Sequence, residues 1–279
     1  MIINSGPVDL DASATALGVQ VGLDVAGSVT GDMASGGALS VTRTQAETSA
    51  IGIASGSDTD EILNTALIDV DSQSSATGFS GNYSVIVSKQ GAVSGGGCVS
   101  DASVLAASSA TGIDGGDSDD TITSTTADDD AIRLLADSEA TGVAASFTVA
   151  GSVSGAANAG DALSEARTDA DAQATGIAGG EGVDTVVSNT SIDASAESTA
   201  TAVSGAFSVG VSVEGDVTAG AAVSDASSLA TTRAVGIDGG ADGDTIGGED
   251  GITGGIVLSA DSEANGVAAS FSVAGSVTG

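Results

Sequence analysis

A short motif recurs through the whole chain: an alanine, any residue, a glycine, and then an aliphatic residue or phenylalanine. Its spacing alternates, because the successive differences in position from Ala50 to Ala264 are 26, 34, 30, 34, 26, 34 and 30. Units of about 31 residues therefore pair into larger repeats of 60 or 64, which predicts an array of stacked repeats. The copies begin at Ala50, Ala76, Ala110, Ala140, Ala174, Ala234 and Ala264, with a variant at Ala200 and an irregular copy near Ala14.

The repeats predict one continuous array over residues 1–279 and no division into separate globular domains. Both ends fall inside a repeat, and residues Ala264–Gly279 closely copy Ala140–Gly155 before the sequence stops. We therefore expect the chain to be a segment of a longer protein. The large repeats are predicted at about 14–75, 76–139, 140–199 and 200–263, with a partial repeat at 264–279.

Alternation of small and charged residues indicates β-strands. Between Ala162 and Gly176 the even positions hold small residues, and the odd positions hold the charged ones, such as Glu165 and Arg167. A period of two is typical of a half-buried strand, whereas a helix would scatter these charges around its axis. At the alanine–glycine motif the apolar residues change parity, as they do after Gly142, which predicts a bulge or corner there.

Strand, corner, strand and turn, repeated about every 31 residues, predict an all-β fold, a right-handed parallel β-solenoid. Tyr83, Phe147, Phe207 and Phe271 each follow a motif alanine by seven residues. They are predicted to form a buried column with rings about 9.6 Å apart, if every second coil contributes one. The alternative fold is an antiparallel β-meander with two very long strands in each large repeat.

Charge excludes several classes of partner. The chain has 38 acidic and five basic residues, a net charge of −33 at pH 7. Nucleic acid and anionic lipid surfaces would be repelled, and no apolar run approaches the ~18 residues that span a bilayer. Hydrophobic residues make up 41% of the chain but are mostly alanine and valine, which predicts a thin core. A folded polyanion of this kind is expected to recruit cations.

An acidic turn recurs once in each large repeat. Residues Gly179–Val187 read GGEGVDTVV and fit the pattern G-G-x-G-x-D-x-U-x, where U is a large aliphatic residue. Near-matches begin at Gly115 and Gly239, and a degenerate copy runs from Ser55 to Leu63. This nonapeptide resembles the calcium-binding turn of repeats-in-toxin (RTX) proteins, which wind into parallel β-rolls.

The resemblance implies a calcium site at these turns, because Ca²⁺ takes six to eight oxygen ligands. In RTX proteins neighbouring turns share each ion, whereas here a whole large repeat separates one motif from the next. Acidic turns that fold without metal are therefore the alternative. The candidate metal ligands are Asp60, Asp114, Asp117, Asp119, Asp120, Glu181, Asp184, Asp238, Asp242 and Asp244.

Strands of Ala, Thr, Ser and Val punctuated by acidic turns resemble giant secreted bacterial repeat proteins over nearly the whole chain. This group includes RTX-like adhesins and autotransporter-like passenger solenoids. The resemblance implies an extracellular structural protein, a stalk, fibre or filament of a biofilm or surface matrix, adhesive and stabilised by calcium. Its expected partners are further coils stacked head to tail, and a cell surface or polysaccharide, but neither nucleic acid nor a membrane interior.

A carbohydrate-active β-helix enzyme is the alternative function. Residues Asp128–Asp130 and Arg133 form the one acidic cluster that does not recur, and paired carboxylates can carry acid–base chemistry. The chain has no histidine, and the run stands where an insertion in a turn is expected. Because all other acidic clusters recur, we predict a structural protein without catalytic residues.

Overall fold

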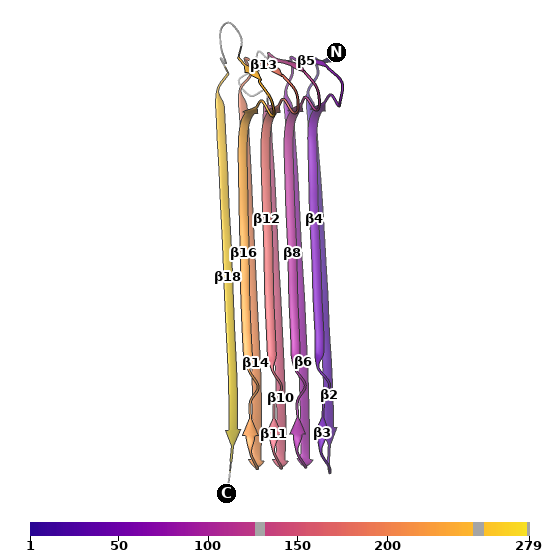
Figure 1. Cartoon of the computed structure of the whole chain (residues 1–279), viewed down its shortest axis with the longest axis vertical. Coiled ribbons are helices and arrows are strands. Elements are labelled where there is room, and N and C mark those ends of the chain that lie inside the picture. The colour runs from indigo at the N-terminus through magenta and orange to yellow at the C-terminus, as the bar shows by residue number, and fades with distance from the viewer. Residues whose placement is uncertain (126–131, 248–253, 278–279) are drawn as a thin grey trace.

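The computed structural model describes residues 1–125, 132–247 and 254–277, which form stacked β-strands (Figure 1). No helix within these three segments is long and apolar enough to cross a membrane. The strands are β1 (Ile2–Asn4), β2 (Val8–Ser28), β3 (Met33–Ala34), β4 (Ala38–Ala54), β5 (Glu61–Asn64), β6 (Ile68–Gln90), β7 (Val93–Ser94), β8 (Cys98–Asp114), β9 (Thr121–Ser124), β10 (Ile132–Ser154), β11 (Ala157–Asn158), β12 (Ala162–Ala178), β13 (Thr185–Ser188), β14 (Ile192–Glu214), β15 (Val217–Thr218), β16 (Ala222–Asp238), β17 (Thr245–Ile246) and β18 (Ile256–Ser276).

The long strands form two facing sheets. Sheet 1 has the order β18-β14-β10-β6-β2, and sheet 2 has the order β16-β12-β8-β4. All pairs within both sheets are parallel and in register, as where Phe147 on β10 lies beside Phe207 on β14. The predicted parallel β-solenoid is therefore confirmed, and the antiparallel meander is wrong.

The predicted coil length is also wrong, because one coil contains both of the smaller units. The chain follows a strand of sheet 1, turns, returns along sheet 2 and turns again before it meets its own copy. Paired residues such as Ile68, Ile132 and Ile192 are therefore one large repeat apart, not one small unit. The rejected meander was right that each large repeat holds two long strands, but these lie in different sheets.

Small side chains fill the space between the sheets. On β10 the inward positions hold Gly142, Ala144, Ser146 and Thr148. A Cβ on Gly142 would lie 2.8 Å from a methyl group of Thr168 in the facing sheet, so the sheets lie too close for larger residues there. Serines cross the gap to the other backbone, and Ser100 Oγ donates to the carbonyl of Ala145 at 2.7 Å. Bulky aliphatic side chains occur inside near the ends of the strands, where isoleucines predominate.

The aromatic column lies on the outside of sheet 1, which corrects the prediction that it is buried. Tyr83, Phe207 and Phe271 are 38%, 39% and 58% exposed. The fourth member, Phe147, lies on β10, and the strands β6, β10, β14 and β18 that carry the rings are consecutive in sheet 1. The ring centroids of Phe147 and Phe207 are 6.1 Å apart. The longer predicted spacing assumed that every second coil contributes a ring, whereas each of these coils contributes one.

Only half of the predicted corners exist. On β12 the alternation of burial breaks at Gly176, and both Ala174 and Ile177 point into the core. On β10 the strand continues through Gly142 without a break, because the change of parity there moves large apolar residues to the outer face. Hydrophobicity alone therefore assigns the wrong inner face to this half of sheet 1.

The difference in length between the two kinds of large repeat is confined to one kind of connection, which leads from the short strand after the acidic turn to the next strand of sheet 1. Ser124 pairs with Asn64 and Ser188, and Ile132 pairs with Ile68 and Ile192. Seven residues separate Ser124 from Ile132, whereas three separate each of the paired positions. The extra four residues therefore lie between β9 and β10 and leave the register of both sheets unchanged.

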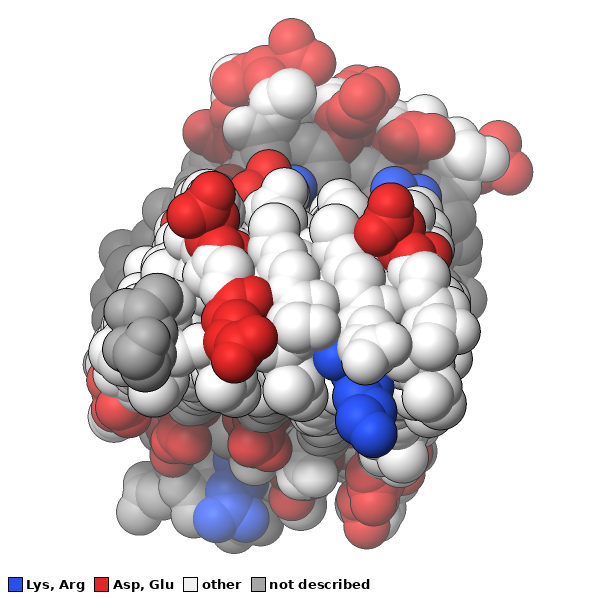
Figure 2. Space-filling view, turned by 90° about the horizontal axis from the view of Figure 1, so that it is seen from below, with Lys and Arg blue, Asp and Glu red and all other residues white. Residues whose placement is uncertain are grey.

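The molecule is a narrow slab whose strands are far longer than its stack is high. A strand of 23 residues such as β10 spans about 75 Å, while five strands stack to about 24 Å. The acidic turns lie at one end, beside β5 and β13, and the connections through β3 and β11 lie at the other (Figure 1). From that second end, uncharged side chains cover much of the face, with separate acidic and basic groups among them (Figure 2).

Candidate functional site

The acidic turns stack directly on one another and form the predicted candidate site. Gly180 and Gly182 have φ values of 109° and 120°, a region that L-residues rarely adopt. The same conformation is kept where the sequence departs from glycine, with φ of 84° at Ser118 and 81° at Asp242. The turn geometry therefore persists through the imperfect copies of the nonapeptide, at a cost in backbone strain.

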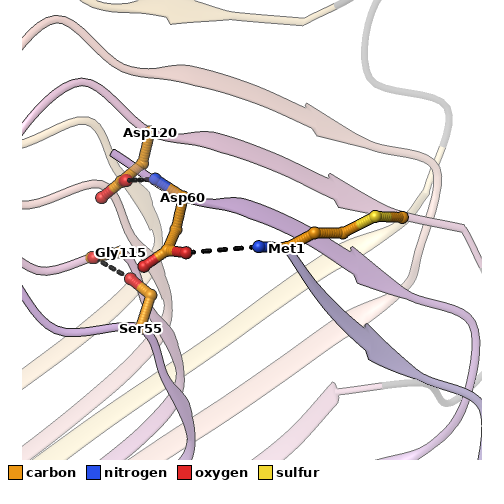
Figure 3. A network of polar contacts seen from close by, with 5 residues as sticks. All are labelled: Met1, Ser55, Asp60, Gly115 and Asp120. Atoms are coloured by element: carbon orange, nitrogen blue, oxygen red, sulfur yellow. Dashed lines mark hydrogen bonds and ion pairs between the residues drawn. The ribbon is translucent and has the colours of Figure 1, made fainter. Parts of the chain in front are cut away.

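The motif aspartates form a column along the edge of the stack, Asp60, Asp120, Asp184 and Asp244. In each step the backbone N–H of one aspartate donates to Oδ1 of the aspartate in the next coil, at 2.6, 2.8 and 3.0 Å. The N-terminal ammonium lies 3.5 Å from Asp60 at the start of this column (Figure 3). The carboxylates thus act as acceptors that tie successive turns together.

The two central aspartates are buried, and no basic side chain of the described residues lies beside them. Asp120 is 2% exposed and Asp184 is fully buried. The Oδ2 atom of each makes no hydrogen bond within the described segments, and none of the basic side chains described there forms an ion pair with either. Burial raises the pKa of Asp120, the hydrogen bond from Asp60 lowers it, and the negative charge of Asp184 raises it further.

A glycine makes room for each buried oxygen. A Cβ on Gly179 would lie 2.7 Å from Oδ2 of Asp184, and one on Gly115 would lie 3.1 Å from Oδ2 of Asp120. The backbone of the next coil is closer still, because a Cβ on Gly179 would lie 2.2 Å from the carbonyl oxygen of Gly239, so both contacts require the first glycine of the nonapeptide. In the degenerate turn Ser55 takes this place, and its hydroxyl donates to the carbonyl of Gly115 (Figure 3).

The other candidate ligands do not converge on the column. Asp114 and Asp238 each accept a bond from their own turn, from Gly116 N at 3.1 Å and Gly240 N at 3.2 Å. They lie two coils apart with Ala178 between them. The remaining candidates, exposed at the tips of the turns, are Asp117, Asp119, Glu181 and Asp242.

Among the exposed candidates, Asp117 and Glu181 are bridge partners in neighbouring turns, and Asp119 accepts a bond from Val183 N at 2.8 Å. Within residues 1–125, 132–247 and 254–277, no three acidic or cysteine side chains meet in a group that could hold a metal ion. The structure thus aligns the four column aspartates, places Asp117 beside Glu181 in the neighbouring turn, and keeps the other candidates apart from the column. A cation at the column would bind the Oδ2 atoms of Asp120 and Asp184, which accept no hydrogen bond among the described residues, and would need further oxygen ligands besides them.

The sequence prediction missed a second polar column beside the first. Asn64, Ser124 and Ser188 are fully buried, each four residues after a column aspartate. Asn64 Nδ2 donates to Ser124 Oγ at 3.2 Å, and Asn4 Nδ2 donates to Asn64 Oδ1 at 2.8 Å. The constant spacing from the aspartate was the signal that could have revealed this column.

The run Asp128–Asp130, on which the enzyme alternative rests, lies outside the described residues. Its basic neighbour Arg133 is exposed and lies 3.9 Å from Asp69 on the adjacent strand, an ion pair across the surface of sheet 1. Surface pairs of this kind contribute roughly 0–1 kcal/mol. Arg133 is thus accounted for by its own sheet.

Replacing a buried carboxylate with an amide tests what compensates the column. In the absence of divalent cations we expect Asp184→Asn to stabilise the fold by roughly 1–2 kcal/mol, because a buried carboxylate without an ion-pair partner costs more than a neutral amide that still accepts from Asp120 N. Thermal unfolding in chelator measures this, with exposed Asp193→Asn as the matched control. If calcium binds the column, calcium should raise the midpoint of the wild type and not of Asp184→Asn. Destabilisation of Asp184→Asn in chelator would contradict the reading of an uncompensated charge.

The strained turn position gives a second prediction. Ser118→Gly should stabilise the fold by roughly 0.5–1 kcal/mol, because glycine adopts a φ of 84° without the steric cost that serine has. Denaturant unfolding of the variant measures the change in midpoint. Ser103→Gly on β8, where serine lies in an ordinary strand, should destabilise instead, and the same sign for both variants would argue against strain at Ser118.

Comparison of the chain with known protein families, with curated proteins and with solved structures finds no match.

Proposed function

We propose that this chain is a structural protein of the cell exterior, whose coils build a flat ribbon in a fibre or surface matrix. The observation that carries the proposal is the unbroken parallel register, in which successive coils repeat nearly the same strand sequence. The outer strands β2 and β18 end sheet 1 with one side unpaired among the described residues. Free N–H and C=O groups along a strand of 21 residues favour pairing with a further coil.

The proportions of the coil favour a ribbon over a stalk. Each coil, one large repeat of sequence, adds a single strand spacing of about 4.8 Å to the length of the stack. A helix made from the same number of residues would extend about 90 Å. A chain folded in this way therefore forms a wide surface, which suits a matrix, and adds little length per residue.

Composition supports an exterior, cation-dependent setting. A net charge of −33 makes separate copies of the chain repel one another in low salt, and divalent cations or raised ionic strength screen that repulsion. Calcium at the acidic turns, adhesion to a cell surface or polysaccharide, and secretion belong to this proposal. The acidic turns that resemble those of RTX proteins support them.

Fibre diffraction and electron microscopy test the proposal. In calcium or raised salt the isolated chain should form ribbons of constant width with a reflection near about 4.8 Å along the fibre axis. Sheet 1 has five strands and sheet 2 has four, so a copy that pairs with β18 leaves a gap of one strand in sheet 2 at each junction. The gap weakens the junctions, and the ribbons should therefore shorten on dilution. A monodisperse monomer under all these conditions would overturn self-assembly.

An edge variant shows whether growth uses β18. Val277 N bonds to β14, and Gly255 O accepts from Ile192, so odd-numbered residues of β18 face β14 and even-numbered residues face the free edge. Ala268→Pro therefore removes one free N–H and keeps the bonds to β14. It should suppress ribbons, whereas Ala268→Ser, which keeps the N–H, should not. Equal ribbon formation by both variants would exclude this edge.

A further inference from the structure

The outer face of sheet 1 is divided along the strands into an acidic half and an apolar half. On β14 the outward residues begin with Asp193 and Glu197, near the acidic turns, and continue as Val203, Phe207, Val209 and Val211. Because the strands are in register, each neighbour repeats this change at the same level. We call the outward residues at 19–29, 79–89, 143–153, 203–213 and 267–277 the apolar half.

The apolar half is exposed and has no partner within the described parts of the chain. Leu23 is 71% exposed on β2, Val211 is 45% exposed on β14, and Val267 is 59% exposed on β18. Over most of this length the inner positions of the same strands cannot hold such large side chains, because the facing sheet limits them to small residues, and Ile86 near the far end of β6 is an exception. Charge is sparse on this surface, where Lys89 lies at its border near the far end of β6.

The surface of the apolar half is flat. The ring of Phe207 lies over Gly205, where a Cβ would meet it at 3.4 Å, and the rings of Phe79 and Tyr83 flank Gly81 in the same way. The long strands run straight beside one another with little twist (Figure 1). Flat sheets of several strands are uncommon and are typically stabilised by stacking on another sheet.

The size of the apolar half matches a stable interface. Five strands at about 4.8 Å, each contributing about ten residues at about 3.3 Å, cover roughly 800 Å². Standard protein interfaces bury about 800 Å² on each partner. Contiguous exposed apolar patches on monomeric proteins are typically no larger than a few hundred Å².

We propose that the apolar half binds the apolar half of a second copy of this chain, face to face, with the strands of the two copies antiparallel. The charge distribution selects both the partner and the orientation. In a parallel arrangement the acidic halves would face each other at the sheet spacing of about 10 Å. In the antiparallel arrangement a two-fold axis crosses the apolar halves, and the two acidic halves extend beyond the contact in opposite directions.

This pairing goes beyond the proposed ribbon, because it uses the face of sheet 1 and leaves both edges free. It gives a closed, isologous dimer, whereas edge pairing gives open growth. A ribbon of two stacked slabs results if both contacts operate. Failure of one contact leaves the other intact, and variants in β14, which is not an edge strand, separate the two.

Sedimentation equilibrium at moderate salt, with Ala268→Pro present to stop edge growth, tests the proposal. The parent should be a dimer at micromolar concentration. Adding carboxylates to the apolar half, Val203→Glu with Val211→Glu, should weaken dimerisation roughly 100-fold or more, because four carboxylates would be buried in the contact. Ser195→Glu with Thr199→Glu, on the same strand and of the same charge, lies in the acidic half and should leave the dimer intact.

A spin-label distance fixes the orientation. A nitroxide at Thr199→Cys should give a label separation of roughly 60 Å in the antiparallel dimer and of less than about 20 Å in a parallel one. The native Cys98 is buried, and burial raises the pKa of its thiol to about 11, so it should remain unlabelled.

Several outcomes would overturn the proposal. They are a parent that stays monomeric up to about 100 μM, equal weakening by both double variants, and a short label distance. Binding of the monomeric parent to vesicles of zwitterionic lipid, lost in Val203→Glu with Val211→Glu, would assign the face to a lipid surface and not to a second copy. Folding of the variants is checked by far-UV circular dichroism, and a second pair, Val143→Glu with Val149→Glu on β10, should reproduce the loss.

Discussion

Gly176→Ala should destabilise the fold by roughly 3 kcal/mol or more, or prevent folding, although it adds a single methyl group. The new Cβ would lie 2.3 Å from the carbonyl oxygen of Gly236 in the next coil and 2.6 Å from a methyl group of Ile192. The backbone oxygen belongs to the neighbouring strand of sheet 2 and cannot move without disturbing the ladder between the coils. The same contact recurs at Gly112, so the motif glycine is a packing requirement of the stacked bend.

The control for this variant is Gly151→Ala on β10. A Cβ there meets nothing closer than 4.0 Å, so alanine should be neutral or stabilise the strand by up to about 1 kcal/mol. Denaturant unfolding of both variants gives the two free energies. A Gly176→Ala protein as stable as Gly151→Ala would mean that the coils can separate at the bend, against the close stacking described above.

Ile192→Ala should cost roughly 2–5 kcal/mol, and Phe207→Ala on the same strand should cost only about 1–1.5 kcal/mol, although it removes the larger side chain. Ile192 is 1% exposed in the isoleucine-rich part of the core, whereas Phe207 is 39% exposed on the outer face. Truncation leaves a cavity at the first position and removes a partly solvated ring at the second.

Unfolding free energies of the two variants, measured in one denaturant series, test the assignment of inside and outside. The comparison is made on monomer, with Val203→Glu and Val211→Glu as the common background, so that the proposed dimer contact does not contribute. A greater loss of unfolding free energy for Phe207→Ala than for Ile192→Ala would show that the aromatic column is buried in the core.

The repeat spacing predicted the stacking of this chain but not the size of its coil. Parallel, in-register pairing was predicted from residues that recur once in each large repeat, and Phe147 and Phe207 lie beside each other accordingly. The coil length was wrong because the two long strands of a coil carry the same alanine–glycine motif, at Ala140 and Ala174. Sequence similarity does not distinguish a strand that pairs with its copy from one that faces it across the core.

The inner face of sheet 1 could not be read from hydrophobicity. Large apolar residues usually mark the buried side of a strand, but here Ala144 and Ser146 point inward while Val143 and Phe147 point outward. The decisive quantity is the gap between the sheets, which depends on contacts such as that between Gly142 and Thr168 and has no local signature. The turns were better predicted, because their glycines and aspartates serve local geometry and one step of stacking.

The connection between β9 and β10 makes this fold a natural frame for displayed peptides. Because four extra residues enter there without shifting either sheet, longer or shorter loops can be exchanged at that point while the coils keep their pairing. Extra residues occur in the same way between β17 and β18, two coils further on, as the longer step from Ile192 to its partner Ile256 requires. The strands that flank these two connections lie at the same end of the slab, two strand spacings or about 9.6 Å apart along the stack. The length and sequence of these connections can therefore vary at one end of the molecule while the two sheets stay the same.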